Sequence, residues 1–268
     1  MLGQPSARGG TITPKKMFNK KLTADGDFGR LRPHTVTTKT KKVITMRIKV
    51  LLLAAVVCVA TAASSLAQVY SVNAVGYVNK EVPAGGFAIL SNPLNQPTNN
   101  LATVFPNVPD NFIVYKYVAN TFQQITKRTI GGQVRWTGGL GADEIVNPGM
   151  GFFVKNPSTT ETLKLTFVGE VPQGTGLTVP FAAGFNLISS IVPQAGAVKT
   201  TLGLPVANNE VIYKYGAAGY VQSTLRVIGG QDRWTGGDST EPVIDVGEGF
   251  WYKANATGNW ARDFSVNP

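Results

Sequence analysis

The sequence predicts an all-β protein made of two tandem homologous repeats, each a small β-sandwich or barrel with one short helical turn. A ten-residue phrase occurs twice, as IGGQVRWTGG at 130–139 and as IGGQDRWTGG at 228–237. The same spacing of 98 residues relates the YKY of 115–117 to that of 213–215, and the GMGF of 149–152 to the GEGF of 247–250. Runs of alternating β-branched and aromatic residues, bounded by Gly, Pro and Asn, indicate strands and hairpins.

The strongly basic balance of the chain is confined to its first quarter. The formal net charge is +10, and residues 1–67 hold twelve Lys and Arg against two Asp. The other 201 residues therefore carry thirteen charges of each sign. Because nucleic-acid binding needs a basic surface, we expect no nucleic-acid partner for the folded part.

Residues 46–67 are typical of a secretory signal peptide. MRIK is followed by the apolar run VLLLAAVVCVATAA and by SSLAQ, which predicts cleavage between Ala67 and Gln68. An uncleaved anchor is the alternative, although a membrane span needs about 20 apolar residues. Residues 1–45 lack apolar periodicity, so they are either a disordered extension or a mis-assigned start before Met46. We expect a secreted protein, extracellular or periplasmic, with no membrane association after cleavage.

Export would also remove the only cysteine and the only histidine, Cys58 and His34. A chain of residues 68–268 could form no disulfide, thiolate nucleophile, Cys/His zinc site or histidine base. We expect no cofactor and no enzymatic activity.

The first repeat is predicted to span residues 68–174. An entry strand at 68–80 precedes a strand at 87–91, whose apolar run predicts burial on both faces. A helical turn at 98–105 would be capped by Thr98 or Asn99, with Leu101, Val104 and Phe105 inward. A hairpin at 112–117 and 121–126, the decapeptide, and strands at 151–155 and 163–168 complete this repeat.

The second repeat is predicted to span residues 175–268 and to keep the same order. A linker at 173–176 leads to a strand at 185–189 and a helical turn near 200–201. Strands follow at 211–215, 220–224, 249–254 and 264–266.

Several of these segments resemble a repeat found in bacterial exported proteins. GFNLIS at 184–189, IYKY at 212–215 and VGEGFW at 246–251 are similar to the pattern GWNLIS…YxY…GxGYW of surface-layer-associated and other secreted proteins. YSVNAVGYVN at 70–79 resembles the start of uncharacterised exported proteins of verrucomicrobia-type bacteria. The first repeat departs from the pattern at Ala88 and Phe153. The resemblance implies fold class and location, and it brings no catalytic or binding residues.

The decapeptide contains the candidate ligand-binding residues Arg135, Trp136, Arg233 and Trp234. Strand alternation places Val134 and Trp136 on one face and Arg135 on the other. Asp232 replaces Val134 in the second copy, so that face should be wet at one end. The tryptophans could stack on a sugar ring beside the arginines. They could also cover the end of a sheet, or contact the other repeat or a partner.

Trp251 is the fifth candidate, because alternation turns it outward beside Lys253 as a cation–π pair or a contact surface. Asp238, Glu241 and Asp245 are weak metal candidates, since their spacing is not that of a calcium loop. We therefore expect a structural, adhesive or envelope-associated protein whose partners are glycans or envelope components. A carbohydrate-binding module using the Trp and Arg faces is the first alternative. A carboxylate-based hydrolase in the second repeat is the other.

Overall fold

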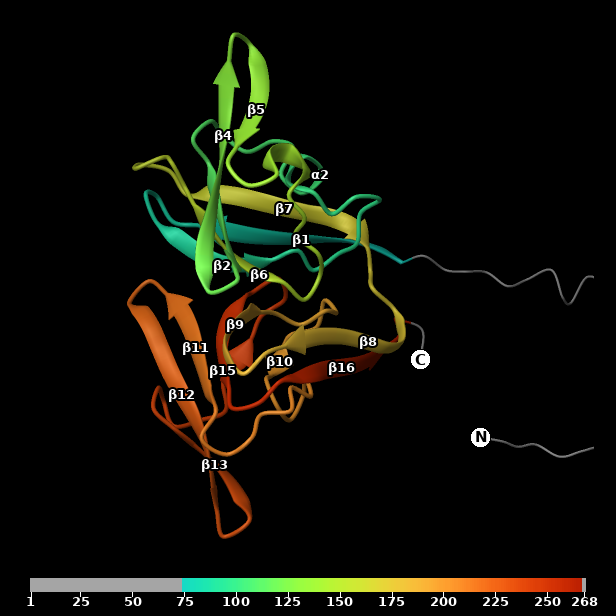
Figure 1. Ribbon diagram of the computed structural model, residues 1–268, viewed down its shortest axis with the longest axis vertical. Coiled ribbons are helices and arrows are strands. Elements are labelled where there is room, and N and C mark those ends of the chain that lie inside the picture. The colour runs from blue at the N-terminus through green and yellow to red at the C-terminus, as the bar shows by residue number, and fades with distance from the viewer. Residues whose placement is uncertain (1–73, 267–268) are drawn as a thin grey trace, which may run out of the picture. The chain divides into compact units, whose positions relative to one another are not determined.

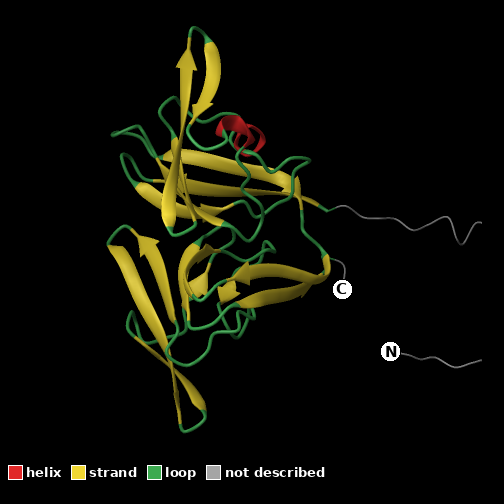
Figure 2. Cartoon of the chain, viewed as in Figure 1, coloured by secondary structure: helices red, strands yellow, loops and turns green. Residues whose placement is uncertain are grey.

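The computed structural model describes residues 74–266, which belong to one compact unit. Nearly all of its regular secondary structure is β-strand (Figures 1 and 2), which confirms the predicted all-β fold class. The first half contains β1 (Val75–Val82), β2 (Phe87–Ser91), α2 (Leu101–Val104), β3 (Ile113–Val118), β4 (Thr121–Ile130), β5 (Gln133–Thr137), η1 (Gly141–Asp143), β6 (Gly151–Lys155) and β7 (Leu163–Glu170).

The second half repeats this order of strands. It contains β8 (Gly174–Phe181), β9 (Gly184–Ile188), β10 (Gly196–Ala197), β11 (Val211–Gly216), β12 (Gly219–Ile228), β13 (Gln231–Thr235), β14 (Val243–Ile244), β15 (Phe250–Ala254) and β16 (Gly258–Phe264). The bounds of β3, β4 and β5 return 98 residues later as those of β11, β12 and β13.

Each half forms a sandwich of one five-stranded and one two-stranded antiparallel sheet. The first sandwich pairs β1 with β7 and orders its larger sheet β2-β6-β3-β4-β5. The second sandwich pairs β8 with β16 and orders its larger sheet β9-β15-β11-β12-β13. A short ladder of β10 with β14 is added in the second sandwich.

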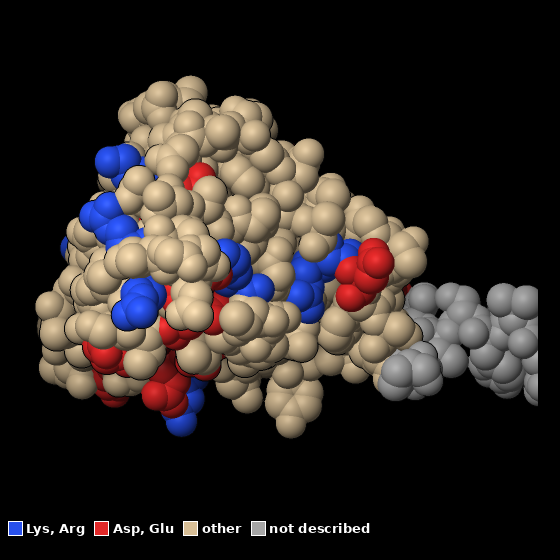
Figure 3. Space-filling model, turned by 90° about the horizontal axis from the view of Figure 1, so that it is seen from below, with Lys and Arg blue, Asp and Glu red and all other residues tan. Residues whose placement is uncertain are grey.

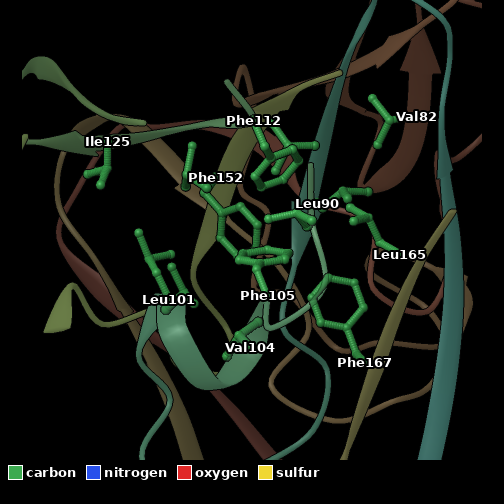
Figure 4. Close-up of a cluster of buried hydrophobic side chains, with 14 residues drawn as sticks. Val82, Leu90, Leu101, Val104, Phe105, Phe112, Ile125, Phe152, Leu165 and Phe167 are labelled. Carbon is green, nitrogen blue, oxygen red and sulfur yellow. The ribbon is translucent and has the colours of Figure 1, made fainter. Parts of the chain in front are cut away.

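The core of the first sandwich lies between its two sheets. Phe105 follows α2 and packs against Phe112, Phe152 and Phe167 with ring centroids 5.3, 5.8 and 5.7 Å away (Figure 4). Leu101, Val104 and Phe105 are all buried, as predicted. The predicted cap residues were wrong, because the side chain of Asn100 accepts from the Thr103 backbone N–H.

The core of the second sandwich is built around Trp260, which is fully buried and donates its indole N–H to the carbonyl of Leu202 at 2.7 Å. The helical turn predicted near 200–201 is a hydrogen-bonded turn and no α-helix. The backbone N–H groups of Thr201 and Leu202 both donate to the carbonyl of Ala197.

Some predicted boundaries were wrong. Residues 174–176, expected as linker, are the first residues of β8, which is the counterpart of β1. The last strand runs over 258–264 and not over 264–266. Phe87 is 37% exposed, so β2 is not buried on both faces throughout. Residues 68–73 of the predicted entry strand, the signal peptide and residues 1–45 lie outside the described residues.

The outer faces of the two five-stranded sheets pack against each other. Their contact is an aromatic and aliphatic cluster of four buried residues, with four tyrosines packed around it: Ile89, Phe153, Leu187 and Trp251, and Tyr115, Tyr117, Tyr213 and Tyr215. The two sheets are therefore separate, and each is covered on both faces near its centre.

The contacts between the sandwiches are reciprocal, as in a two-fold symmetric dimer interface. Ser91 Oγ donates to Ser189 Oγ at 2.8 Å, and these serines occupy equivalent positions 98 residues apart. Ser91 N–H donates to the carbonyl of Gly247, and Ser189 N–H donates to that of Gly149, both at 3.0 Å. The isolated bridges are reciprocal too: Leu90 with Glu248, and Ile188 with Met150.

The glycine pairs that flank 150 and 248 serve this contact. A Cβ added to Gly249 would lie 2.7 Å from Ile89 Cγ2 and 2.8 Å from the Leu90 carbonyl oxygen. A Cβ on Gly151 would lie 3.0 Å from the carbonyl carbon of Leu187. Glycine at these positions allows the two backbones to approach each other.

Candidate binding surfaces

The decapeptide forms the exposed end of a hairpin in each sandwich. β4 and β5 join through Gly131-Gly132, whose φ angles of 60° and 77° fit the tight turn that hairpins favour. Gly229-Gly230 repeats these angles at 61° and 76°. In Figure 1 the end of the β4–β5 hairpin stands clear of the rest of its sandwich.

The glycines after each tryptophan fix where the hairpin rejoins the fold. Gly138 has a φ of 97°, and an added Cβ would lie 2.1 Å from the carbonyl oxygen of Gln124. Gly236 repeats this arrangement, with a φ of 83° and a distance of 2.5 Å to the carbonyl oxygen of Gln222. No other residue fits such a close approach at positive φ.

Trp136 and Trp234 lie on the inner face of their hairpins and are half-buried against the two cores. Trp136 packs edge-to-face on Phe112, with ring centroids 6.4 Å apart. Farther along this face Val134 is 59% exposed, and Asp232 forms a 2.5 Å ion pair with Lys199. The face is wet at its end, as predicted, and each tryptophan covers the edge of a core.

Arg135 and Arg233 lie on the opposite, outer face, where each pairs with a second arginine. Arg128 is the register partner of Arg135, and Arg226 is that of Arg233. Paired residues of antiparallel strands share a face, so each hairpin carries two adjacent cationic side chains. All four are exposed, and none forms an ion pair within residues 74–266.

The next pair on this face toward each turn is the same in both hairpins, namely Ile130 with Gln133 and Ile228 with Gln231. Arg135 Nη2 donates to Gln133 Oε1 at 3.2 Å. The outer face of each hairpin tip, defined by these two pairs, is called the arginine face below. Its residues are Arg128, Ile130, Gln133 and Arg135 in the first copy and Arg226, Ile228, Gln231 and Arg233 in the second.

Trp251 lies in the contact between the sandwiches and is 9% exposed. Its ring packs edge-to-face against Tyr117 at 4.7 Å, and its indole N–H donates to the hydroxyl of Tyr220 at 3.3 Å. The ammonium group of Lys253 lies over the ring of Phe185, at 5.4 Å, rather than over Trp251. Trp251 is thus placed apart from the hairpins.

The metal candidates do not come together. Glu241 accepts from the N–H groups of Lys199 and Thr200, and Asp238 accepts from Thr240. The hydrogen bonds from Thr240 lower the pKa of Asp238. In the part of the chain that the structure describes, no three His, Cys, Asp or Glu side chains are grouped so that they could hold a metal ion, Asp245 included.

Two larger hollows accompany these surfaces. One of about 730 Å³ is lined by the Asp238–Val243 loop, Lys214 and Glu248, and there Lys214 forms a 3.2 Å ion pair with Glu248. The other, of about 810 Å³, lies between the sandwiches and is lined mostly by proline, asparagine and aliphatic residues together with Tyr117 and Phe185, with no acidic or basic side chain.

Two buried polar groups could not be predicted from the patterns. Lys116 and Glu144 form a buried ion pair at 2.5 Å. Glu210 is buried and accepts the hydroxyl of Tyr252, whose pKa is raised by burial and by this carboxylate. Either acid would have counted as a catalytic candidate by residue type alone, but both are enclosed in the fold.

No family model, no curated protein and no solved structure matches this chain. The resemblance to exported bacterial repeat proteins therefore stays a prediction. None of the helices in residues 74–266 is long and apolar enough to cross a membrane.

Proposed function

We propose that the protein is exported and serves a non-enzymatic structural or adhesive role at the cell envelope, with its two arginine faces as attachment points. The observation that carries this proposal is that the arginine face consists of the same four residue types in both copies. Four exposed positions are the same in the two hairpins, while the inner face carries Val134 in one and Asp232 in the other. Packing does not require the same residues at these four positions, because exposed residues contact few neighbours.

The paired arginines favour an anionic partner. Like charges directly opposite each other destabilise a β-ladder, and none of the four arginines forms an ion pair with another described residue that would offset this effect. A guanidinium group binds carboxylate or sulfate through two parallel hydrogen bonds. Polymeric uronic or sulfated glycans of an envelope present such groups repeatedly, so two equivalent faces would bind one polymer with avidity.

The charge distribution supports a local site rather than a general basic surface. Residues 74–266 carry thirteen basic and thirteen acidic side chains. Figure 3 shows one face of the molecule, on which the two signs lie interspersed among uncharged residues. Binding would therefore depend on the hairpins and would not follow from net charge.

The two resolved carboxyl pKa shifts do not favour the hydrolase alternative. A glycosidase needs one carboxylic acid whose pKa is raised so that it can donate a proton. The carboxyl pKa shifts that are resolved, at Glu144 and Asp238, are both downward. Burial raises the pKa of Glu144, but the hydrogen bonds from Lys116 and Leu140 together outweigh this effect, so the net shift is downward.

A carbohydrate-binding module that stacks sugars on Trp136 and Trp234 is the second candidate. Their partial exposure favours it. The arginines point to the opposite face of each strand, so one sugar ring could not meet both groups at once. The two candidates thus make different predictions for neutral and acidic glycans.

A polymer-binding assay separates the candidates. The full chain is mixed with beads of alginate, of a sulfated dextran and of neutral dextran at several salt concentrations. We expect retention on the anionic beads that falls with salt. Arg128→Thr with Arg135→Thr should weaken retention more than tenfold by removing avidity, and the four-arginine variant should abolish it. Retention on neutral dextran that is lost with Trp136→Ala and Trp234→Ala would favour the second candidate.

Fractionation of the source cells tests the location. N-terminal sequencing of the native protein should find a chain that begins at Gln68 in the envelope or medium fraction. A chain that keeps residues 46–67 and stays in the cytoplasm would contradict the proposal.

A further inference from the structure

A second surface, independent of the hairpins, is an open cleft of about 460 Å³ at the contact between the sandwiches. Its lining consists of six aromatic side chains, Phe87, Tyr115, Phe122, Phe153, Tyr215 and Tyr220. Phe87, Phe122 and Tyr220 are 37%, 50% and 52% exposed. Exposed aromatic rings gathered at one concave place are typical of a binding site.

The symmetry of the contact gives this cleft an equivalent place, and the two places share Phe122 and Tyr220. Phe153 corresponds to Trp251, and the six lining positions correspond to Phe185, Tyr213, Tyr220, Trp251, Tyr117 and Phe122. The indole of Trp251 fills the equivalent place. Its centroid lies 4.7 Å from that of Tyr117, 6.0 Å from Phe122 and 6.1 Å from Phe185.

Phe153 makes only part of this set of contacts. Its ring packs against Tyr215 at 5.9 Å, which matches the contact of Trp251 with Tyr117. The other two contacts of Trp251, with Phe185 and Phe122, would correspond to contacts of Phe153 with Phe87 and Tyr220. Among the described residues Phe153 forms neither of these ring contacts. The benzyl group of Phe153 is smaller than the indole group of Trp251, and Phe153 lines the open cleft.

We propose that this cleft binds a small planar aromatic molecule of about the size of indole. The equivalent place in the same fold holds an indole group edge-to-face among the corresponding rings, which is the geometry that aromatic pairs prefer. Three of the lining residues, Tyr115, Phe153 and Tyr215, belong to the contact between the sandwiches, so this part of the cleft is already held in place.

The chemistry of the lining selects an apolar ring over a sugar. A sugar needs several hydrogen-bonding groups placed around it, and the six lining side chains offer only three tyrosine hydroxyls. The ammonium group of Lys155 lies at the rim, 5.5 Å from the centre of the Phe87 ring. None of the lining residues belongs to the arginine faces, so this proposal and the proposed function can fail separately.

The test is a titration of the full chain with indole, followed by site-resolved NMR. We expect shifts at Phe87, Phe122 and Tyr220 with a dissociation constant of about 1 mM or tighter, and none with glucose at the same concentrations. Tyr220→Ala, which removes one exposed wall, should weaken binding at least fivefold without unfolding the chain.

Exchange of the two equivalent residues provides the matched control. Phe153→Trp should fill the cleft and weaken indole binding at least tenfold. Trp251→Phe should open a second cleft and add shifts at Phe185 and Tyr213, and the double exchange should move binding to that place alone. No binding to the unmodified chain, or binding that is unchanged by Phe153→Trp, would overturn the proposal. Binding of a tryptophan-containing peptide but not of indole would also overturn it.

Discussion

The two sandwiches have different residue types, one charged and one apolar, at the same buried position. In the second sandwich Glu210 accepts hydrogen bonds from the Tyr252 hydroxyl and from the backbone N–H groups of Ala207 and Asn255. In the first sandwich the position 98 residues earlier is Phe112, which is fully buried and makes no polar contact through its side chain.

The residues around Phe112 explain how the first sandwich dispenses with a carboxylate. The positions equivalent to Ala207 and Asn255 are Pro109 and Pro157, which have no N–H to satisfy. Proline at these two positions removes the backbone donors that the carboxylate accepts from in the second sandwich. The strand framework was thus kept in both copies, while loops and interior side chains changed together.

The largest expected effect comes from Glu210→Ala. This change leaves the buried Tyr252 hydroxyl and two part-buried backbone N–H groups without their acceptor, and we expect the free energy of unfolding to fall by about 3 kcal/mol. Chemical denaturation of the full chain measures it.

The matched control places the residues of the first sandwich at the equivalent positions of the second. Glu210→Phe combined with Ala207→Pro, Asn255→Pro and Tyr252→Val should be within about 1.5 kcal/mol of the unmodified chain. A loss below about 1 kcal/mol for Glu210→Ala would show that these hydrogen bonds do not hold the second sandwich together.

Glu144→Gln should follow with an effect of similar size. We expect it to lower the free energy of unfolding by about 3 kcal/mol, because it leaves the buried ammonium of Lys116 without its counter-charge. Lys214, the residue equivalent to Lys116, pairs instead with Glu248, and Glu248→Gln should change the free energy of unfolding by about 1 kcal/mol or less, since this pair is more exposed. Equal losses in the two variants would contradict the difference in burial.

The same pair makes stability depend on pH. The pKa of Glu144 in the folded chain lies below its ordinary value of 4.5, so the contribution of its charged form is present above about pH 4.5 and is lost as the pH falls through the folded pKa. Thermal melting of the unmodified chain and of Glu144→Gln should therefore converge as the pH drops below that value.

Gly249→Ala should lower stability by about 2 kcal/mol, because the new methyl group would meet Ile89 and the Leu90 carbonyl across the contact. Gly216→Ala is the control, since no atom lies within 4 Å of a Cβ at that position. A neutral Gly249→Ala would mean that the sandwiches do not approach each other so closely.

The smallest effect is expected at the arginine faces. Arg128→Thr should change the free energy of unfolding by about 0.5 kcal/mol or less, toward greater stability, because it removes a repulsive pair. The same change should weaken binding to anionic beads. A large loss of stability would mean that the arginines stabilise the fold and are not kept for a partner.

Much of the fold could be predicted from the sequence. The order of strands along the chain, the hairpins and the opposite faces of Trp136 and Arg135 follow from alternation and turn residues, which are local signals. The internal repeat adds the correspondence of the two sandwiches. The contact between them could not be predicted, because the reciprocal pairing of Ser91 with Ser189 joins residues far apart in the chain.

The candidate surfaces were predicted only in part. Arg135 and Arg233 were named, but their partners Arg128 and Arg226 emerge only from the strand register. Trp251 was predicted to face outward, yet only the packed sheets show that it fills a space between the sandwiches. The aromatic cleft beside Phe153 depends on the difference in size between two equivalent side chains, a comparison that needs their neighbours.

The reciprocal contact between the two sandwiches is tested most directly by a disulfide across the two equivalent serines. Ser91→Cys and Ser189→Cys are introduced together in a chain whose Cys58 is replaced by serine, and free thiols are counted after mild oxidation. With the serine Oγ atoms 2.8 Å apart, both thiols should disappear into one intramolecular disulfide while the circular dichroism of the chain is retained. Two free thiols in a chain that is still folded would contradict the symmetric contact.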